Sequence, residues 1–265
     1  RSEGCGVVLL KRLSDALQDG DSIQAVIKGW GVNQDGKTNG LTAPSGDSQT
    51  RLITQVYQKY GIDPETIDLV EAHGTATKLG DPIELMALDK AYKQFTDKQA
   101  YCAVGTVKSN IGHTLEAAGV AGIIKLVQSL QHQKLPPTIN YQDLNEEIQI
   151  SDSALYINTE LSEWHKSNDI KRRCAISSYG LSGTNAHVVL EEAPQVPERQ
   201  QPEMQRPQHV LPLSAKSEAA LEAQINQYRV YLKTSIDKSI NLGDICYTAG
   251  VGRSHFDYRL AVVGS

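Results

Sequence analysis

Two histidines, His73 and His113, stand where a side chain can do chemistry, because each follows a segment that predicts a β-strand. Ligands of open α/β folds bind beyond the carboxyl ends of strands, so both imidazoles can converge on one substrate carbonyl. His113 also precedes an apolar stretch typical of a helix, whose amino-terminal partial charge disfavours an imidazolium. A neutral ring donates one hydrogen bond, which suits a developing enolate oxygen. The alternatives are that His73 is a structural histidine and that His113 only caps the helix.

A third candidate is the glycine-rich turn over residues 179–185, with the sequence YGLSGTN. Gly180 and Gly183 permit a tight turn and a close approach of main-chain N–H groups to a ligand. The alternative is an ordinary hairpin loop. The sequence contains neither the Walker A pattern nor the GxGxxG pattern, which disfavours phosphate binding.

Short strands and helices are predicted to alternate around these motifs. The helix that follows His73 has a typical start in Asp81, Pro82 and Glu84: a cap acceptor, a proline at the first helical position and a glutamate that can reach back to the cap. The helix that follows His113 is apolar nearly all round, which predicts that it is buried. Strands are predicted over 7–10, 23–28, 67–72, 101–107, 173–178 and 186–191, helices over 47–60, 81–92 and 114–131, and a loop over 33–40.

This order of elements favours an α/β fold in which helices cover a sheet, with the last two strands forming an antiparallel hairpin. Four prolines among many glutamines then mark an extended linker. We predict a first domain over residues 1–194, the linker over 195–209 and a small α/β unit over 210–265. That unit is expected to contain an amphipathic helix through Leu221, Ile225, Tyr228 and Leu232, a short helix near 242–249 and a strand over 258–263.

Composition excludes several classes of function. The formal net charge is -5 and the basic residues are scattered, so no nucleic-acid partner is expected. No apolar run is long enough to cross a bilayer and no signal peptide is recognisable, so we expect a cytoplasmic protein without a membrane partner. The four cysteines, Cys5, Cys102, Cys174 and Cys246, form no paired motif and lie among apolar neighbours, which favours structural thiols over disulfides, a metal site or a nucleophile.

Taken together, the segments around His73 (EAHGTATKLGDP) and His113 (VKSNIGHT) and the turn around Leu181 resemble the carboxy-terminal half of a ketosynthase, the β-ketoacyl synthase domain of modular type I polyketide synthases. The resemblance implies a thiolase-like layered fold. Residues 210–265 resemble the adapter that follows such a domain and leads to an acyltransferase. Both ends of the chain look like cuts through a longer polypeptide, and the adapter is expected to be incomplete.

The resemblance also implies roles for individual residues. His73 and His113 would be catalytic, Lys108 would form an ion pair with Glu84, and the backbone N–H of Leu181 would complete an oxyanion hole. Thr75 and Thr77 match threonines that face the pantetheine arm of the substrate in ketosynthases. Two positions depart from the family pattern, since Ala76 replaces a glycine and Leu181 replaces a frequent phenylalanine.

The implied reaction is decarboxylative Claisen condensation of an acyl chain with a malonyl-type extender, both carried as phosphopantetheine thioesters on acyl carrier protein. No resident cofactor or metal is implied. The nucleophilic cysteine is expected upstream of Arg1, so the chain alone should be inactive in condensation. A homodimer and a fused or separate acyltransferase are the expected partners.

Other classes of protein stay open. A non-elongating scaffold or a decarboxylase-only relative would keep the same fold. A stand-alone fatty acid condensing enzyme is disfavoured by the adapter. A thiolase is disfavoured because Ser182 stands in the glycine-rich region where a second catalytic cysteine would be sought.

Overall fold

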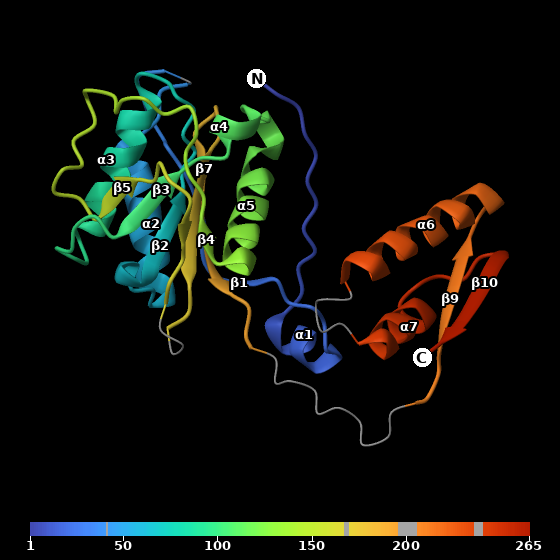
Figure 1. The fold of residues 1–265 in the computed structure, drawn as a ribbon. Coiled ribbons are helices and arrows are strands. Elements are labelled where there is room, and N and C mark those ends of the chain that lie inside the picture. The colour runs from blue at the N-terminus through green and yellow to red at the C-terminus, as the bar shows by residue number, and fades with distance from the viewer. Residues whose placement is uncertain (41, 167–169, 196–205, 236–240) are drawn as a thin grey trace. The chain divides into compact units, whose positions relative to one another are not determined.

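The computed structural model describes residues 1–40, 42–166, 170–195, 206–235 and 241–265 (Figure 1). The chain divides into two units, Arg1–Val196 and Pro197–Ser265. Residues 196–205, most of the expected linker over 195–209, lie outside the described residues.

The larger unit is built on a six-stranded mixed sheet with the order β1-β8-β7-β2-β3-β5. β2 is parallel to both β3 and β7, and β3 is parallel to β5, whereas β8 runs antiparallel to its neighbours β7 and β1. The predicted hairpin is therefore confirmed. The strands are β1 (Ala25–Gln34), β2 (Ile67–Glu71), β3 (Cys102–Gly105), β5 (Leu155–Ile157), β7 (Arg173–Tyr179) and β8 (Thr184–Glu192).

Helices cover both faces of this sheet, as Figure 1 shows. α2 (Gly46–Tyr60) and α3 (Gly80–Tyr92) pack on one face, and α5 (Ala118–His132) packs on the other. Because successive side chains of a strand point to opposite faces, Val70 joins the core under α2 and α3 while its neighbour Leu69 joins the core under α5. The α/β layered core predicted from the order of elements is confirmed.

Local sequence explains the ends of α2. The Ser45 side chain accepts a hydrogen bond from Ser48 N at the amino end, and Gly61 takes a left-handed conformation with φ of 60° at the carboxyl end. α5 differs from its prediction, because it is buried along one face only and Ile124 on its open side is 40% exposed.

Three other predictions need correction. The segment Val7–Leu10 forms no strand, because no described strand lies beside it to complete a ladder, and Leu9 is 97% exposed. β1 begins at Ala25 and runs to Gln34, two residues into the predicted loop, because it pairs with the whole length of β8. The helix after His73 begins at Gly80 and not after Asp81.

Short elements complete the larger unit. They are α1 (Leu13–Asp19), α4 (Lys108–Ile111), two 3₁₀ turns (Pro64–Thr66 and Leu115–Ala117) and a two-stranded ribbon of β4 (Lys134–Leu135) and β6 (Ser162–Glu163).

The smaller unit is a two-stranded antiparallel sheet with two helices. Its core contains Leu211 and Leu213 from the first strand and Cys246 and Ala249 from the second helix. The first strand begins at His209 and was not predicted from the sequence. Pro212 lies within this strand, opposite Ala261 of its partner, and proline is tolerated in strands at the edge of a sheet. The elements are β9 (His209–Ala215), α6 (Glu218–Ser235), α7 (Leu242–Val251) and β10 (Tyr258–Gly264).

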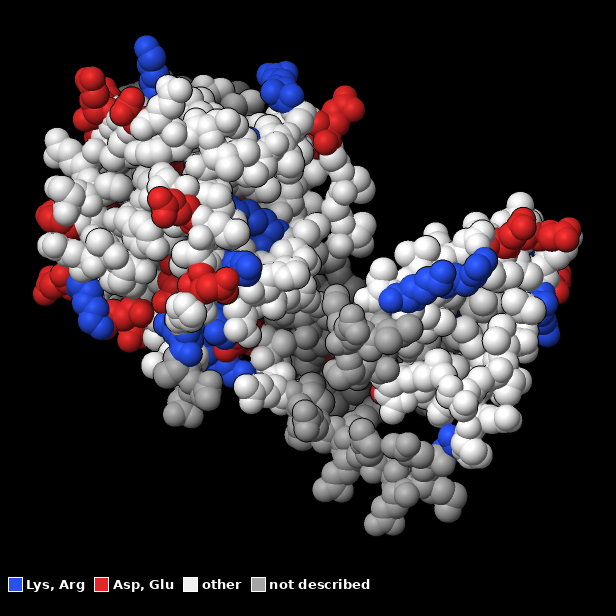
Figure 2. Space-filling model, in the orientation of Figure 1, with Lys and Arg blue, Asp and Glu red and all other residues white. Residues whose placement is uncertain are grey.

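On the face shown in Figure 2, basic and acidic side chains are interspersed over the larger unit and do not gather into one basic stripe. In the described part of the chain, no helix is both long and apolar enough to cross a lipid bilayer.

Candidate active site

The structure brings His73 and His113 together. Their ring centroids lie 5.4 Å apart and the rings are almost perpendicular, at 87°. His73 lies two residues beyond the end of β2, and His113 follows the neighbouring strand β3 and the short helix α4. Parallel pairing of β2 with β3 explains the meeting, because it places the carboxyl ends of both strands at the same edge of the sheet.

His73 is half-buried and is held in its neutral state. Burial lowers the pKa of its imidazole to about 3, and the positive charge of Lys108 acts in the same direction. The Nδ1 atom is buried and has no hydrogen-bond partner among the described residues. The Tyr179 ring meets the His73 ring edge to face, with centroids 5.7 Å apart. This ring is therefore fixed by packing and can present a nitrogen to a ligand.

His113 is held in one tautomer by the backbone that follows it. Its Nδ1 accepts a hydrogen bond from Leu115 N at 3.0 Å. Because Nδ1 is an acceptor, the proton of the neutral ring is assigned to Nε2, which is then a donor. Burial lowers the pKa of His113, and the charge of Lys108 lowers it further. The ring thus both caps the 3₁₀ turn and offers a neutral N–H, so the two interpretations of this histidine are compatible.

Glu84 does not pair with Lys108, which corrects the ion pair expected between them. Both carboxylate oxygens of Glu84 accept main-chain hydrogen bonds, from His73 N at 2.7 Å and from Gly74 N at 2.8 Å. No salt bridge joins Glu84 to Lys108 in the described structure. Glu84 is buried, and burial raises its pKa to about 7 against the effect of these two bonds. Its carboxylate therefore holds the His73 turn directly.

Lys108 lies near several carboxylates without a direct ion pair to any described residue. Burial lowers the pKa of its ammonium, whereas the carboxylates of Glu71 and Glu84 act in the opposite direction. Its charge reaches both imidazoles, since it lowers the pKa of each. Lys108 thus helps to keep both rings neutral.

The buried ion pair at this site is Glu71 with Lys125, which sequence reasoning missed. Lys125 Nζ lies 2.6 Å from Glu71 Oε2, and Val107 N donates to Glu71 Oε1 at 2.6 Å. A signal was present in the sequence, because Lys125 is the one charged residue between Ala117 and Gln131 in an otherwise apolar helix. A lone charge in such a helix requires a buried partner.

Thr75 and Thr77 lie on the loop between His73 and α3. Their hydroxyl oxygens are 3.3 Å apart, and Thr77 Oγ1 accepts a hydrogen bond from Gly80 N at 3.0 Å. Thr77 therefore satisfies the first N–H of α3, which lies before Asp81. Ala76, between the threonines, has a left-handed φ of 57°, a conformation that costs a residue with a side chain more than a glycine.

The glycine-rich turn lies between β7 and β8 and is tied to the end of β1. Asp35 N donates to the Gly183 carbonyl at 2.9 Å, and Asn185 Nδ2 donates to Asp35 Oδ1 at 2.7 Å. Leu181 is 76% exposed, and its backbone N–H has no hydrogen-bond partner among the described residues. Since Tyr179 of the same turn contacts His73, the turn adjoins the two histidines.

A cavity of about 590 Å³ lies beside the His73 loop. Its wall includes Gly74, Thr77 and Glu84 from the loop and α3, and Thr106 and Thr138 from the adjoining strands and connections. Thr77 therefore borders this space, whereas Thr75, His73 and His113 are not among the residues that line it.

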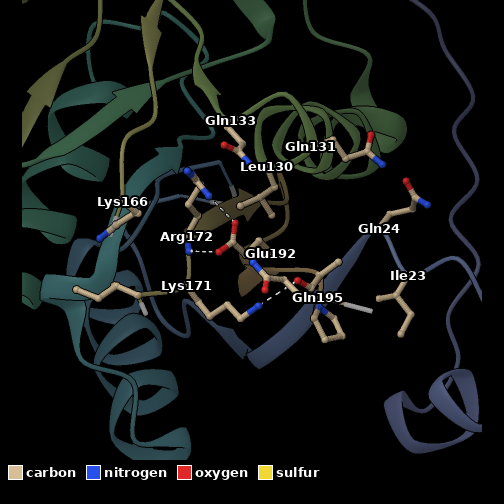
Figure 3. Close-up of a pocket in the computed structure, with 13 residues that line it drawn as sticks. Ile23, Gln24, Leu130, Gln131, Gln133, Lys166, Lys171, Arg172, Glu192 and Gln195 are labelled. Atoms are coloured by element: carbon tan, nitrogen blue, oxygen red, sulfur yellow. Dashed lines mark hydrogen bonds and ion pairs between the residues drawn. The ribbon is translucent and has the colours of Figure 1, made fainter. Parts of the chain in front are cut away.

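A second cavity, of about 350 Å³, is lined by residues at the start of β7 and the end of β8 (Figure 3). Its charged side chains each have a partner. Arg172 pairs with Glu192 at 2.8 Å, and Lys171 Nζ donates to the Ala193 carbonyl at 3.2 Å. Lys166, on the same wall, pairs with Asp68 at 2.9 Å. Each charged side chain that lines this cavity therefore has a partner.

The cysteines and the metal-ligating residues give no further site within the described residues. Cys102, Cys174 and Cys246 are buried, and burial raises the pKa of the Cys102 thiol to about 12. No three His, Cys, Asp or Glu side chains in the described ranges are grouped so that they could hold a metal ion.

Comparison with known families gives two matches. Residues 24–142 match the family described as the carboxy-terminal domain of β-ketoacyl synthases. Residues 209–265 match the family described as the CurL-like carboxy-terminal region of polyketide synthases.

Curated relatives are similar over almost the whole chain. The chain is 48% identical to polyketide synthase PksL of Bacillus subtilis over 98% of its own length, and 47% identical to the pikromycin synthase component PikAIII of Streptomyces venezuelae over 90%. It spans 6% and 16% of these two proteins.

Solved structures are similar in both sequence and fold. The ketosynthase from module 6 of the bacillaene synthase of Bacillus subtilis is 45% identical, with a TM-score of 0.87, and 96% of this chain corresponds to 43% of that one. The ketosynthase from module 1 of the bacillaene synthase of Bacillus amyloliquefaciens is 42% identical, with a TM-score of 0.86 and the same two shares. The expected thiolase-like fold is confirmed by these neighbours.

Proposed function

Because the chain belongs to the β-ketoacyl synthase family, as the ketosynthase region of a polyketide synthase, we propose that the complete protein catalyses decarboxylative Claisen condensation. The observation that carries the proposal is the facing pair of neutral imidazoles, His73 and His113. The substrates are an acyl chain and a malonyl-type extender, both phosphopantetheine thioesters of acyl carrier protein. The acyl chain is held as a thioester on a cysteine outside the printed sequence.

In the decarboxylation step, the bond between the α-carbon and the carboxylate of the extender breaks. The carboxylate leaves as carbon dioxide, and the electron pair of the broken bond forms an enolate. Negative charge then develops on the thioester oxygen. His113 donates its Nε2–H to that oxygen, and the neutral His73 ring beside it donates a second hydrogen bond. Each preorganised donor of this kind contributes about 3–4 kcal/mol to transition-state stabilisation.

In the condensation step, the enolate carbon forms a bond to the acyl carbon, and the cysteine leaves as a thiolate with the electron pair of the thioester bond. The N–H of Leu181 would bind the oxyanion of the tetrahedral intermediate, and its lack of a partner among the described residues supports this role. Thr75 and Thr77 bind the pantetheine arm. A homodimer in the cytoplasm, served by a fused or separate acyltransferase, completes the proposal.

The test is His113→Ala in the complete ketosynthase. Malonyl decarboxylation should fall at least about 100-fold, because one preorganised donor is lost. Acyl loading, measured as an adduct by intact-protein mass spectrometry, should stay within about twofold, because the nucleophile is elsewhere. His132→Ala is the matched control, since this exposed histidine lies at the far end of α5.

Equal loss of loading and decarboxylation in His113→Ala would refute the assigned role. A folded complete domain that takes no acyl adduct would instead place the protein with non-elongating relatives. A decarboxylating domain that takes no adduct would indicate a decarboxylase-only relative.

A further inference from the structure

The ion pair of Glu71 and Lys125 is the least exposed salt bridge of the described residues, with side chains 2% and 13% exposed. Removing two charges from water is costly, and a buried pair is therefore weak evidence for stability as such. Glu71 is nevertheless fully satisfied, because each of its oxygens accepts one short hydrogen bond, from Lys125 Nζ and from Val107 N. This arrangement calls for a role besides stability.

The pair connects three segments that lead to the site. Glu71 ends β2 and lies two residues before His73. Val107 begins the segment that carries Lys108 and ends at His113. Lys125 lies on α5, whose chain follows directly from His113 and its 3₁₀ turn. One carboxylate thus joins the backbone before each histidine to the helix behind them.

The surrounding residues make space for this pair. A Cβ at Gly122 would lie 3.1 Å from Glu71 Cγ and 2.4 Å from Ile176 Cδ1. A Cβ at Gly105 would lie 3.4 Å from Lys125 Nζ. Gly122 on α5 therefore leaves room for the Glu71 side chain, whereas at Gly105 the tightest contact of a Cβ would be with Thr138 Oγ1, at 3.0 Å.

We propose that Glu71 and Lys125 are positioning residues that hold His73 and His113 in their facing, perpendicular geometry. Neither touches the substrate. Their effect on catalysis rests on the proposed function, whereas their effect on the two rings does not.

The decisive variant is the double substitution Glu71→Gln/Lys125→Met in the complete ketosynthase. It removes both charges together, so the net charge near Lys108 is unchanged and no buried charge is left unpaired. The amide oxygen of glutamine still accepts the Val107 N–H, whereas the connection to α5 is lost. Lys125→Arg is the conservative variant, since it keeps the charge and can still donate to Glu71.

A matched control is Glu192→Gln/Arg172→Met. This pair is 2.8 Å apart and mostly buried, with side chains 20% and 13% exposed, and it appears in Figure 3. It lies at the opposite end of the sheet from the histidines, because Arg172 precedes the first residue of β7 and β7 runs parallel to β2. A loss that reflects only missing buried charge should be similar in both double variants.

Three measurements are needed: melting temperature, acyl loading and the kcat and KM of malonyl decarboxylation. We expect the Glu71→Gln/Lys125→Met variant to melt like the control variant, to load acyl groups normally and to lose at least about tenfold in kcat with little change in KM, because misplaced donors act on the transition state. Lys125→Arg should recover most of that loss. Decarboxylation within about twofold of the parent enzyme, or a loss shared by the control, would overturn the proposal.

A fourth measurement does not depend on activity. The imidazole ¹⁵N signals of His73 and His113 should shift in the Glu71→Gln/Lys125→Met variant, while those of the exposed His132 and His165 stay fixed. Unchanged signals from both site histidines would also overturn the proposal. If the parent enzyme decarboxylates nothing, the proposed function fails, but this measurement still decides whether the pair positions the rings. If the double variant does not fold, Lys125→Met and Lys125→Arg are each compared with the parent in all four measurements. A rate and ring signals that stay unchanged in Lys125→Met would then overturn the proposal.

Discussion

Glu84 should make the larger unit less stable as the pH rises from 5 to 8. Its folded-state pKa of about 7 lies above the ordinary value of 4.5, because burial disfavours the charged carboxylate. The folded chain therefore binds a proton more tightly than the unfolded chain does between these values. The stability that Glu84 contributes is fully present below pH 4.5 and is lost as the pH rises through about 7.

The magnitude follows from the two pKa values. One unit corresponds to about 1.4 kcal/mol, so the full effect is about 3 kcal/mol, of which about 2.5 kcal/mol falls between pH 5 and pH 8. Glu84→Gln removes the titration and adds a cost that does not vary with pH, since the amide keeps one acceptor for the two N–H groups of His73 and Gly74. The free energy of unfolding of the parent chain, minus that of the variant, should fall by about 2.5 kcal/mol over this range.

Urea unfolding followed by tryptophan fluorescence measures this difference in the larger unit, because both tryptophans, Trp30 and Trp164, lie there. Subtracting the variant cancels titrations at distant sites. A difference that stays flat within about 0.5 kcal/mol would refute the reasoning. A difference that grows with pH would show that the two main-chain hydrogen bonds outweigh burial and hold the folded-state pKa below 4.5.

Two further outcomes are expected. In the folded chain, iodoacetamide at pH 8 should modify Cys5, which is exposed, and should spare Cys102 and Cys174, because burial raises the pKa values of their thiols. Peptide mapping by mass spectrometry measures the labelling, and fast labelling of a buried cysteine would contradict the prediction. Gly122→Ala should lower the free energy of unfolding by about 1–3 kcal/mol, because the new methyl group would lie 2.4 Å from Ile176 Cδ1; a melting temperature equal to that of the parent would show that the helix moves aside freely.

The layers of the fold could be predicted from sequence because the apolar periodicity of α2 and the two strand-to-histidine segments reflects burial directly. Val7–Leu10 has the same apolar character, but a strand also needs a partner, which no local pattern supplies. β9 was not predicted, and it forms a strand although it contains Pro212, because it pairs with β10 along its whole length.

The candidate site was predictable to the level of residue types but not of partners. His73 and His113 follow parallel strands, so topology alone brings them together. Which carboxylate pairs with which lysine depends on side-chain directions that spacing does not give. The Glu84 carboxylate accepts a hydrogen bond from the main chain of His73, and Glu71 pairs with Lys125 on α5.

The hydrogen bond from Leu115 N to His113 Nδ1 has a consequence for protons during turnover. A ring whose second nitrogen is occupied by the main chain acts as a fixed dipole and not as a proton carrier. In the proposed decarboxylation, charge would form and then leave beside His113 while the ring keeps the same single proton. Each cycle would then begin with this histidine already in its working state, with no separate step to restore it.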